Sequence, residues 1–475
     1  MRILFVVPLA TALTDPFAYP PLGPLMAAAT ARAKGHEVDL CFAHYDPEAG
    51  TCKYGTSRNL DDYRSLVNLR RYDAIGLNIF AEATFDAAHC VLENMPNSLW
   101  IIAGGAFVTS AGQESLDAGV DIGIIDECED SFGDLVNVLK DFPRKKTQDG
   151  SLERLNLNHK LDKIPGLVYN LRGLATWTGH RANPEPLDMM PFPAWDILDP
   201  ELVAQQTHIH LQPDKISTTI FATRGCPFNC TFCNREVGGR KFRSHSPDYI
   251  IRHLNFLRNH YGVNHVRFPD DLFTTNKKWV LEISGRLQEE GFTWACLSRT
   301  DTLDDEMAES MVAGGCQGLF FGIESGSAKM LKLMNKKTSP ETNGRAIERC
   351  RKYGLTSSAY FIFGFPGEDG ETIRETVEWL DQYRPDRAHY STFLPIHGTA
   401  PFREPEEFGI KLRPGYRNWV YYDDMEFPVE YLPPNPSNAE MTFFRQQLHG
   451  AFDRMGYLSF AERKSVSEDL PALST

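Results

Sequence analysis

Three cysteines stand close together in the segment "RGCPFNCTFCNRE", residues 224–236. Their spacing is C-x3-C-x2-C, at Cys226, Cys230 and Cys233, in a chain with 10 cysteines over 475 residues. Three thiolates cannot complete the ligand set of a cuboidal [4Fe-4S] cluster, so one iron would stay open. An open coordination position on a metal can bind and activate a second molecule.

Two other interpretations of these cysteines remain open at this stage. A zinc site needs a fourth ligand, and His245 in "FRSHSPD" is available for that role. The thiols could also be purely structural. Clustered cysteines in a reducing compartment are more often metal ligands or catalytic groups than disulfides, which favours a metal site.

The composition is that of a soluble globular protein, with 42% hydrophobic and 24% charged residues and a net charge of -14. No stretch rich in lysine and arginine occurs, so we do not expect nucleic-acid binding. No apolar run reaches the roughly 20 residues that a membrane span needs. The start, "MRILFVVPLATALTDPFAYPP", is interpreted as a buried strand and its loop rather than a signal peptide, so we expect a cytoplasmic protein.

Short apolar runs alternate with helical stretches in the first part of the chain, which predicts a Rossmann-like parallel sheet domain in residues 1–140. Ligands of such sheets bind at the carboxyl ends of the strands. At those ends the sequence places the Pro8–Gly23 loop, the pair Gly104 and Gly105, and the loop after Asp126. The predicted strands include 2–9, 72–80, 99–107 and 121–127. Residues 23–40 predict a helix that stops at Gly35 and is followed by a further strand, and residues 82–95 predict another helix.

The pattern loosens over residues 141–215, which we interpret as a linker with a small hairpin at 164–180. Alternation returns over residues 216–400, where six strand–helix units predict a partial βα barrel with its chemistry at the carboxyl ends of the strands. Residues 401–475 form a C-terminal extension that includes a helix at 438–455. The predicted fold class is therefore α/β.

The pattern C-x3-C-x-aromatic-C, here with Phe232, directly after the first barrel strand resembles the radical S-adenosylmethionine superfamily. The resemblance implies that the open iron chelates the amino and carboxylate groups of S-adenosylmethionine. Electron transfer then splits the sulfonium, and the resulting 5′-deoxyadenosyl radical takes a hydrogen atom from a substrate. It also implies a small-molecule substrate and an external electron donor of the flavodoxin or ferredoxin type.

Two segments at predicted strand ends extend the resemblance to the methionine and ribose parts of the cofactor. "VRFPDDLFTTN" places Asp270 and Asp271 near the amino group, although either aspartate could instead cap the following helix. "FFGIESGS" offers Glu324 and Ser325 for the ribose and carboxylate, and Gly322 allows close backbone approach; the alternative is a capped turn.

Two further segments complete the predicted S-adenosylmethionine site. "YFIFGFPGED" resembles the backbone segment that flanks adenine, through Gly364, Pro366 and Gly367. Arg299 in "LSRTD" is a candidate partner for the methionine carboxylate or, alternatively, a salt-bridge residue. No side chain is assigned as the catalytic proton donor or acceptor.

The first domain resembles the cobalamin-binding domain of one large branch of this superfamily, through "PPLGPLMAAATARAKGHEVDL" and "IIAGGAFVTSAGQESLDAGVDIGIIDECEDSF". Many members of this branch transfer a methyl group from methylcobalamin. Members often have G-E-G-E where this chain has "DECED", so we expect the larger side chains of Asp126 and Cys128 to narrow this loop. The motif D-x-H-x-x-G, which supplies a histidine to cobalt in other cobalamin proteins, is absent, as is usual for this branch, so its absence neither supports nor excludes cobalamin. The cobalamin contacts that the resemblance implies are Pro8, Leu9, Gly23, Gly104, Gly105 and Glu127.

Three functions follow from these observations. The first is cobalamin-dependent radical C-methylation of a small molecule in natural-product biosynthesis. The second keeps the radical chemistry without methyl transfer, as in diol dehydration of an aminosugar or a rearrangement, with a first domain that lacks cobalamin. The third is a non-catalytic metal-binding scaffold. The complete set of strand-end motifs in the barrel argues against the third function. Of the two radical functions we predict the first, because the first domain resembles the cobalamin-binding domain of a branch with many methylases.

Overall fold

The computed structural model describes residues 1–9, 15–46, 49–64, 69–81, 84–144, 152–183, 185–205, 214–414 and 427–457. The chain forms two units, of which the first comprises Met1–Gln205 with Asn234–Ser246 and the second comprises Gln206–Cys233 with Pro247–Thr475. None of the helices in these ranges is long and apolar enough to cross a membrane.

The first unit is built on an eight-stranded sheet with the order β3-β2-β1-β4-β5-β6-β7-β8. Strands β2, β1, β4, β5 and β6 are parallel, and their apolar sequences suit a sheet that is covered on both faces. The strands are β1 (Arg2–Pro8), β2 (Glu37–Asp46), β3 (Thr51–Gly55), β4 (Ala74–Asn78), β5 (Trp100–Gly104), β6 (Ile122–Ile124), β7 (Leu167–Leu171) and β8 (Leu174–Trp177).

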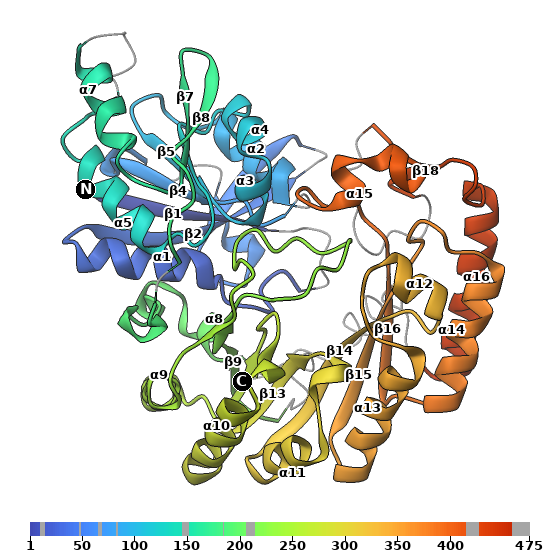
Figure 1. Ribbon diagram of the computed structural model, residues 1–475. Coiled ribbons are helices and arrows are strands. Elements are labelled where there is room, and N and C mark those ends of the chain that lie inside the picture. Colours follow the sequence, from blue (N-terminus) through green and yellow to red (C-terminus); the bar gives the residue numbers. More distant parts are fainter. Residues whose placement is uncertain are drawn as a thin grey trace. The chain divides into compact units, whose positions relative to one another are not determined.

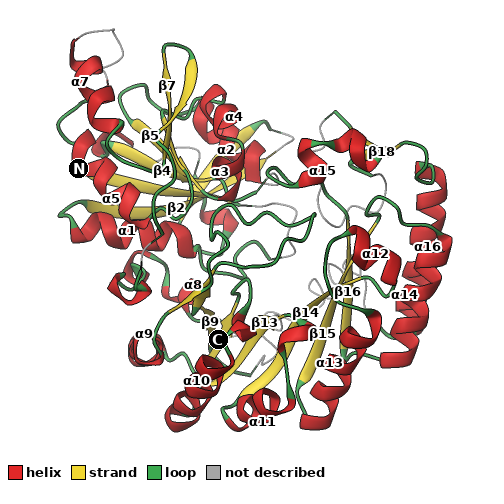
Figure 2. Ribbon diagram, in the orientation of Figure 1, coloured by secondary structure: helices red, strands yellow, loops and turns green. Residues whose placement is uncertain are grey.

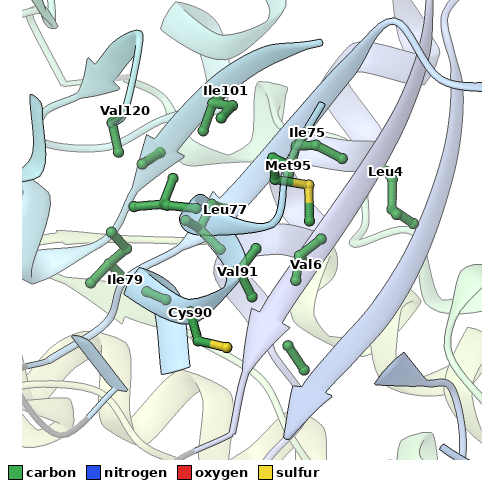
Figure 3. Close-up of a cluster of buried hydrophobic side chains, with 14 of the residues drawn as sticks. Leu4, Val6, Ile75, Leu77, Ile79, Cys90, Val91, Met95, Ile101 and Val120 are labelled. Carbon is green, nitrogen blue, oxygen red and sulfur yellow. The ribbon is translucent and has the colours of Figure 1, made fainter. Parts of the chain in front are cut away.

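Helices cover both faces of this sheet (Figure 1). Successive residues of β1 point to opposite faces: Phe5 packs against Phe132 of α5, whereas Leu4 and Val6 join the cluster formed with α2 (Figure 3). The helices of this unit are α1 (Leu22–Ala33), α2 (Phe85–Glu93), α3 (Ala106–Ser110), α4 (Gly112–Asp117), α5 (Glu129–Leu139), α7 (Leu152–Leu161) and α8 (Pro200–Val203).

The hairpin of β7 and β8 extends this sheet. Strand β7 is antiparallel to both β6 and β8, so β8 runs in the same direction as β6. The residues that follow β8 therefore lie at the same edge of the sheet as the residues that follow β6. The sequence patterns did not predict the antiparallel strand β3 at the other end of the sheet.

The second unit contains a six-stranded parallel sheet with the order β16-β15-β14-β13-β12-β9. Figure 2 shows these strands beside helices that lie on one face of the sheet, as in a partial barrel. The α/β fold predicted from the sequence is thus confirmed. The strands are β9 (Ser217–Thr219), β12 (His265–Phe268), β13 (Thr293–Ser298), β14 (Cys316–Glu324), β15 (Thr356–Phe363) and β16 (Arg387–Thr392).

Helix boundaries in this unit follow from capping residues in the sequence. Asn276 accepts a hydrogen bond from the backbone N–H of Trp279 at the start of α10, and Gly291 ends that helix in a left-handed conformation. Asp369 and Thr372 form a capping box at the start of α14. The helices are α9 (Pro247–Tyr261), α10 (Lys277–Glu290), α11 (Asp305–Ala313), α12 (Ala328–Leu333), α13 (Pro340–Tyr353) and α14 (Gly370–Tyr383).

The C-terminal extension packs on the same unit. Phe452 of α16 contacts Phe361 of β15 and Tyr390 of β16, so α16 covers the helical face of the sheet at its last two strands. Its elements are α15 (Ala400–Arg403), β17 (Ile410–Leu412), β18 (Val429–Tyr431) and α16 (Asn438–Arg454).

The short strands β10 (Thr223–Arg224) and β11 (Arg243–Ser244) flank the cysteine segment in the sequence.

Two glycines in helices of this unit make a matched test of the packing. A Cβ atom at Gly344 of α13 would lie 2.1 Å from ring atoms of Tyr383, whereas a Cβ atom at Gly285 of α10 would meet nothing within 4 Å. Gly344→Ala should lower the free energy of unfolding by about 1–3 kcal/mol because the buried ring cannot move aside freely. Gly285→Ala should raise it by up to about 1 kcal/mol, since alanine is the better helix former. Thermal unfolding of both variants under anaerobic conditions checks this, and shifts of the same sign would contradict the packing described.

Candidate active site

The three predicted cluster cysteines lie on the loop that follows β10, at the carboxyl end of the first barrel strand. Cys230 is buried, and Cys226 and Cys233 are half-buried. Burial raises the pKa of the Cys226 thiol, whereas a hydrogen bond from the Phe228 backbone and the positive charge of Arg299 act in the opposite direction. The donor set, three thiols within one short loop, suits iron.

The thiols are not gathered around a common point. Within the described ranges, no group of three or more His, Cys, Asp or Glu side chains is arranged to hold a metal ion. Cys226 and Cys230 are close enough for a charge on the second to raise the pKa of the first. The loop therefore supplies the ligands, and metal binding would draw their sulfur atoms together.

The segment that follows α12 holds the cysteine loop in place. The backbone N–H of Thr231 donates to the carbonyl oxygen of Met334 at 3.0 Å. The side-chain amide of Asn335 donates to the carbonyl oxygen of Asn229 at 2.6 Å. These bonds fix the backbone on both sides of Cys230, at Asn229 and at Thr231. They therefore limit where the cysteine sulfur atoms can move.

Arg299 lies against the cysteine loop from the end of β13. Its guanidinium carbon is 3.7 Å from the centre of the Phe228 ring, and its Nη1 is 3.9 Å from the sulfur of Cys230. Arg299 also forms a bidentate salt bridge with Asp301, with distances of 2.9 and 3.0 Å. Arg299 is therefore a salt-bridge residue in this structure, as the alternative interpretation expected. Its positive charge also lies next to the thiol of Cys230, which would bind metal as an anion.

Asp270 is fully buried and organises the backbone ahead of the cysteines. Its Oδ1 accepts hydrogen bonds from the backbone N–H groups of Ala222, at 2.8 Å, and of Thr223. Its Oδ2 has no hydrogen-bond partner, and burial raises the pKa of this carboxyl to about 7. Asp271 is exposed. Neither aspartate caps the next helix, because Asn276 does.

Glu324 ends β14 in a left-handed conformation, with φ 65°, where the register with β15 shifts. Its Oε1 lies 2.7 Å from the Nζ of Lys336, and both side chains are buried. A Cβ atom at Gly322 would lie 2.2 Å from the same oxygen, so this glycine leaves the space that the carboxylate occupies. Ser325 contacts Thr376 at 3.2 Å through the two hydroxyl groups.

Phe232 and the loop after β15 complete the predicted S-adenosylmethionine contacts. The ring centre of Phe232 is 5.9 Å from the Nζ of Lys336. Gly364 and Gly367 have φ values of 84° and 96°, which L side chains rarely adopt, and Pro366 lies between them. The strand ends thus bring these residues to one edge of the sheet, as the sequence predicts.

His245, the fourth ligand of the alternative zinc site, contacts Asp188 through its Nδ1 at 3.2 Å and belongs to the first unit. Its side chain is only 3% exposed. The structure therefore gives this histidine a local partner within its own unit.

The carboxyl edge of the first sheet has room for a ligand near β1, β4 and β5. A Cβ atom at Gly23 would meet nothing within 4 Å, and one at Gly104 would meet only Ile124 at 4.0 Å. Tyr19, just ahead of α1, and Phe80, just after β4, expose 42% and 66% of their surface. Exposed aromatic side chains and glycines with free space around them are features that suit a large, mostly apolar ring system such as cobalamin.

Other predicted cobalamin contacts are engaged within the unit. Both carboxylate oxygens of Glu127 bond the guanidinium of Arg243, and each of the two side chains is 3% exposed. Pro8 and Leu9 are buried. Gly105, with φ 120°, lies so close to Ile79 that a Cβ atom would come within 2.4 Å of its carbonyl oxygen.

Asp126, in the "DECED" segment, organises this edge. It has φ 63°, its backbone N–H donates to the hydroxyl of Thr109, and its Oδ2 lies 2.8 Å from the Nδ1 of His180. Burial raises the pKa of Asp126, and the contact with His180 opposes that shift. His180 follows β8, so the parallel course of β6 and β8 explains how a residue 54 positions away reaches this carboxylate.

The sequence did not predict several residues whose hydrogen bonds fix the loops and side chains of the site. Lys336 and Asn335 come from a polar segment with no recognisable motif, and Tyr431 and Asn435 come from the C-terminal extension. Their partners are 12 to 106 positions away in the chain. One sequence carries no signal for such pairs, because only the fold brings them together.

Comparison with known proteins identifies the family that residues 220–380 resemble. The sequence model of the radical SAM superfamily matches residues 220–380, which include the cysteine loop and the strand-end segments. An uncharacterized methyltransferase from Pyrococcus horikoshii is 27% identical over 402 residues, which cover 83% of this chain and 80% of that protein.

A second relative carries a different activity name. The anaerobic magnesium-protoporphyrin IX monomethyl ester cyclase of Rubrivivax gelatinosus is 29% identical over 216 residues. The alignment covers 45% of this chain and 38% of the cyclase, so the chain spans well under half of that relative.

Among solved structures, the radical S-adenosylmethionine methyltransferase TsrM from Kitasatospora setae has a TM-score of 0.62. The match covers 87% of this chain and 79% of TsrM at 14% sequence identity, so it concerns the fold. That structure contains cobalamin and a [4Fe-4S] cluster.

The buried carboxyl of Asp270 predicts a pH-dependent stability. Its pKa is about 7 in the folded chain, against an ordinary value of 3.8. The folded state therefore holds the proton more tightly, and this group's contribution to stability falls as the pH rises through that window. Asp270→Asn cannot titrate, so the melting temperature of the wild type minus that of the variant should fall from pH 5 to pH 8. A difference that does not change with pH would contradict the perturbed carboxyl.

Proposed function

We propose that this chain methylates a small molecule in a cobalamin-dependent radical reaction, because its residues 220–380 match the sequence model of the radical SAM superfamily. The observation that carries this proposal is the three-cysteine loop at the carboxyl edge of a parallel sheet, in a chain whose first unit has a second such sheet with an open edge. When bound, the cluster and S-adenosylmethionine supply a 5′-deoxyadenosyl radical, and cobalamin supplies the methyl group.

The chain's own residues would bind and orient these groups. Cys226, Cys230 and Cys233 are the cluster ligands, and Arg299 offsets the negative charge that the thiolates bring. Asp270 keeps the backbone ahead of the cysteines in one conformation through its two bonds to N–H groups. Preformed geometry of this kind reduces the entropy cost of assembling the site.

The face of the barrel sheet opposite its helices is a candidate substrate surface. Along β15 the half-exposed Tyr360 and Ile362 alternate with the buried Phe361 and Phe363, which face the helices. Tyr360 stacks with Phe320 of β14, and the Arg267 guanidinium lies 4.2 Å from the Phe320 ring centre. Phe320 and Arg267 are themselves buried, so Tyr360 and Ile362 are the partly exposed residues of this group, with the cation behind them. This arrangement suits a small planar or anionic substrate.

A radical reaction without methyl transfer is the second candidate. It is favoured by the likeness to a protein named as a cyclase, and by Glu127, whose carboxylate is committed to Arg243 instead of facing the open edge of the first sheet. In this case the first unit would serve as a scaffold, since a fold does not by itself fix a function.

Labelled S-adenosylmethionine separates the two candidates. The reconstituted enzyme with cobalamin and S-adenosylmethionine carrying a deuterated methyl group should yield S-adenosylhomocysteine, 5′-deoxyadenosine and a deuterated product, measured by mass spectrometry. Production of 5′-deoxyadenosine without S-adenosylhomocysteine would contradict methylation and support the second candidate.

Two cysteine variants provide the control for this measurement. Cys226→Ala should form none of these products and should lose the iron–sulfur absorption, because one cluster ligand is gone. Cys350→Ala changes a fully buried thiol of α13, outside the cysteine loop, and should retain cluster and products. Retention of turnover in Cys226→Ala would instead support a non-catalytic role for the cysteine loop.

A further inference from the structure

The loop after β15, residues 364–369, is bonded to side chains of the C-terminal extension. The carbonyl oxygen of Gly364 accepts a hydrogen bond from the Tyr431 hydroxyl, and the Gly364 N–H donates to Glu368. The Gly367 N–H donates to the Oδ1 of Asn435 at 2.8 Å. Both backbone groups of Gly364 are therefore already paired before any ligand arrives.

These contacts are buried and rigidly supported. Tyr431 and Glu368 are 6% and 3% exposed. Asn435 donates through Nδ2 to the carbonyl oxygens of Phe408 and Gly409, at 2.9 and 2.8 Å, which fixes the direction of its side-chain oxygen. The hydrogen bonds of Tyr431 and Asn435 to the loop therefore have a defined direction and position.

Glycine at position 364 is required by the same network. Gly364 has φ 84°, and a Cβ atom there would lie 2.7 Å from the hydroxyl oxygen of Tyr431. A side chain at this position would push the tyrosine away. The left-handed turn of the loop and the bond from Tyr431 therefore depend on each other.

We propose that Tyr431 and Asn435 are positioning residues for the adenine of S-adenosylmethionine, acting through the backbone of the loop at 364–367. The inference rests on the proposed function and on the expectation from the sequence resemblance that this loop flanks adenine. A loop held in one conformation binds with a smaller loss of conformational entropy than a loop that must be ordered. Because the Gly364 backbone groups are used internally, adenine would meet the loop mainly through its ring face, beside Pro366.

Two tyrosines of the C-terminal extension allow a matched experiment. The Tyr431 hydroxyl bonds a carbonyl oxygen at the carboxyl end of β15. The Tyr457 hydroxyl donates to the carbonyl oxygen of Pro385 at 2.9 Å, ahead of β16 and so at the opposite end of the sheet. Tyr431→Phe and Tyr457→Phe each remove one buried hydroxyl while keeping the ring.

The readout is the dissociation constant of S-adenosylmethionine, from the change in the electron paramagnetic resonance spectrum of the reduced cluster. Tyr431→Phe should raise this constant by about threefold to tenfold, the value of one lost hydrogen bond. Tyr457→Phe should leave it unchanged, and iron content should be equal in both variants and the wild type. Methionine alone, which lacks the adenosyl group, serves as a second probe, and its binding should be the same in all three proteins.

Each other outcome has a distinct meaning. Unchanged S-adenosylmethionine binding in Tyr431→Phe would overturn the inference, and so would equal weakening of S-adenosylmethionine and methionine. If Tyr431→Phe does not fold, Asn435→Ala, which removes the bond to Gly367, should give the same selective loss. A wild type that forms a cluster but binds no S-adenosylmethionine would instead overturn the proposed function.

Discussion

Parallel strands place all their carboxyl ends at one edge of a sheet, and this constraint determines where chemistry can occur in both units of the chain. In the second unit it brings together segments that are more than a hundred residues apart, such as the cysteine loop and the segment after α12, where Asn335 bonds Asn229. Buried polar contacts then fix each loop: Asp270 binds the backbone ahead of the cysteines, and Tyr431 binds the backbone after β15. Breaking a buried bond of this kind leaves an unpaired polar group, so the loops have little freedom to rearrange.

Much of the fold could be predicted from periodicity alone. The expected strand at 2–9 is β1, and the expected helix at 438–455 is α16. Parallel strands buried on both faces carry continuous apolar runs, which are easy to recognise. The short antiparallel strand β3 was missed because "TCKYG" has no such run and pairs only at the sheet edge.

The candidate site was predictable in its loops and less so in its contacts. Cysteine spacing and strand position identified the residues that could bind iron, because that signal is local. The partners of Arg299 and Glu324 were not predictable, since Asp301 is one of many acids near the arginine and Lys336 reaches Glu324 only in the fold. The C-terminal extension showed no motif, yet it supplies Tyr431 and Asn435 to the loop after β15.

Incomplete ligation of one iron by the three-cysteine loop is the central claim. Electron–nuclear double resonance on the reconstituted, reduced enzyme, with ¹⁵N in the amino group and ¹⁷O in the carboxylate of S-adenosylmethionine, tests it most directly. The account predicts that both labels couple to the cluster in the wild type. A well-formed cluster that shows neither coupling would mean that no iron is open to the cofactor, and would contradict the account.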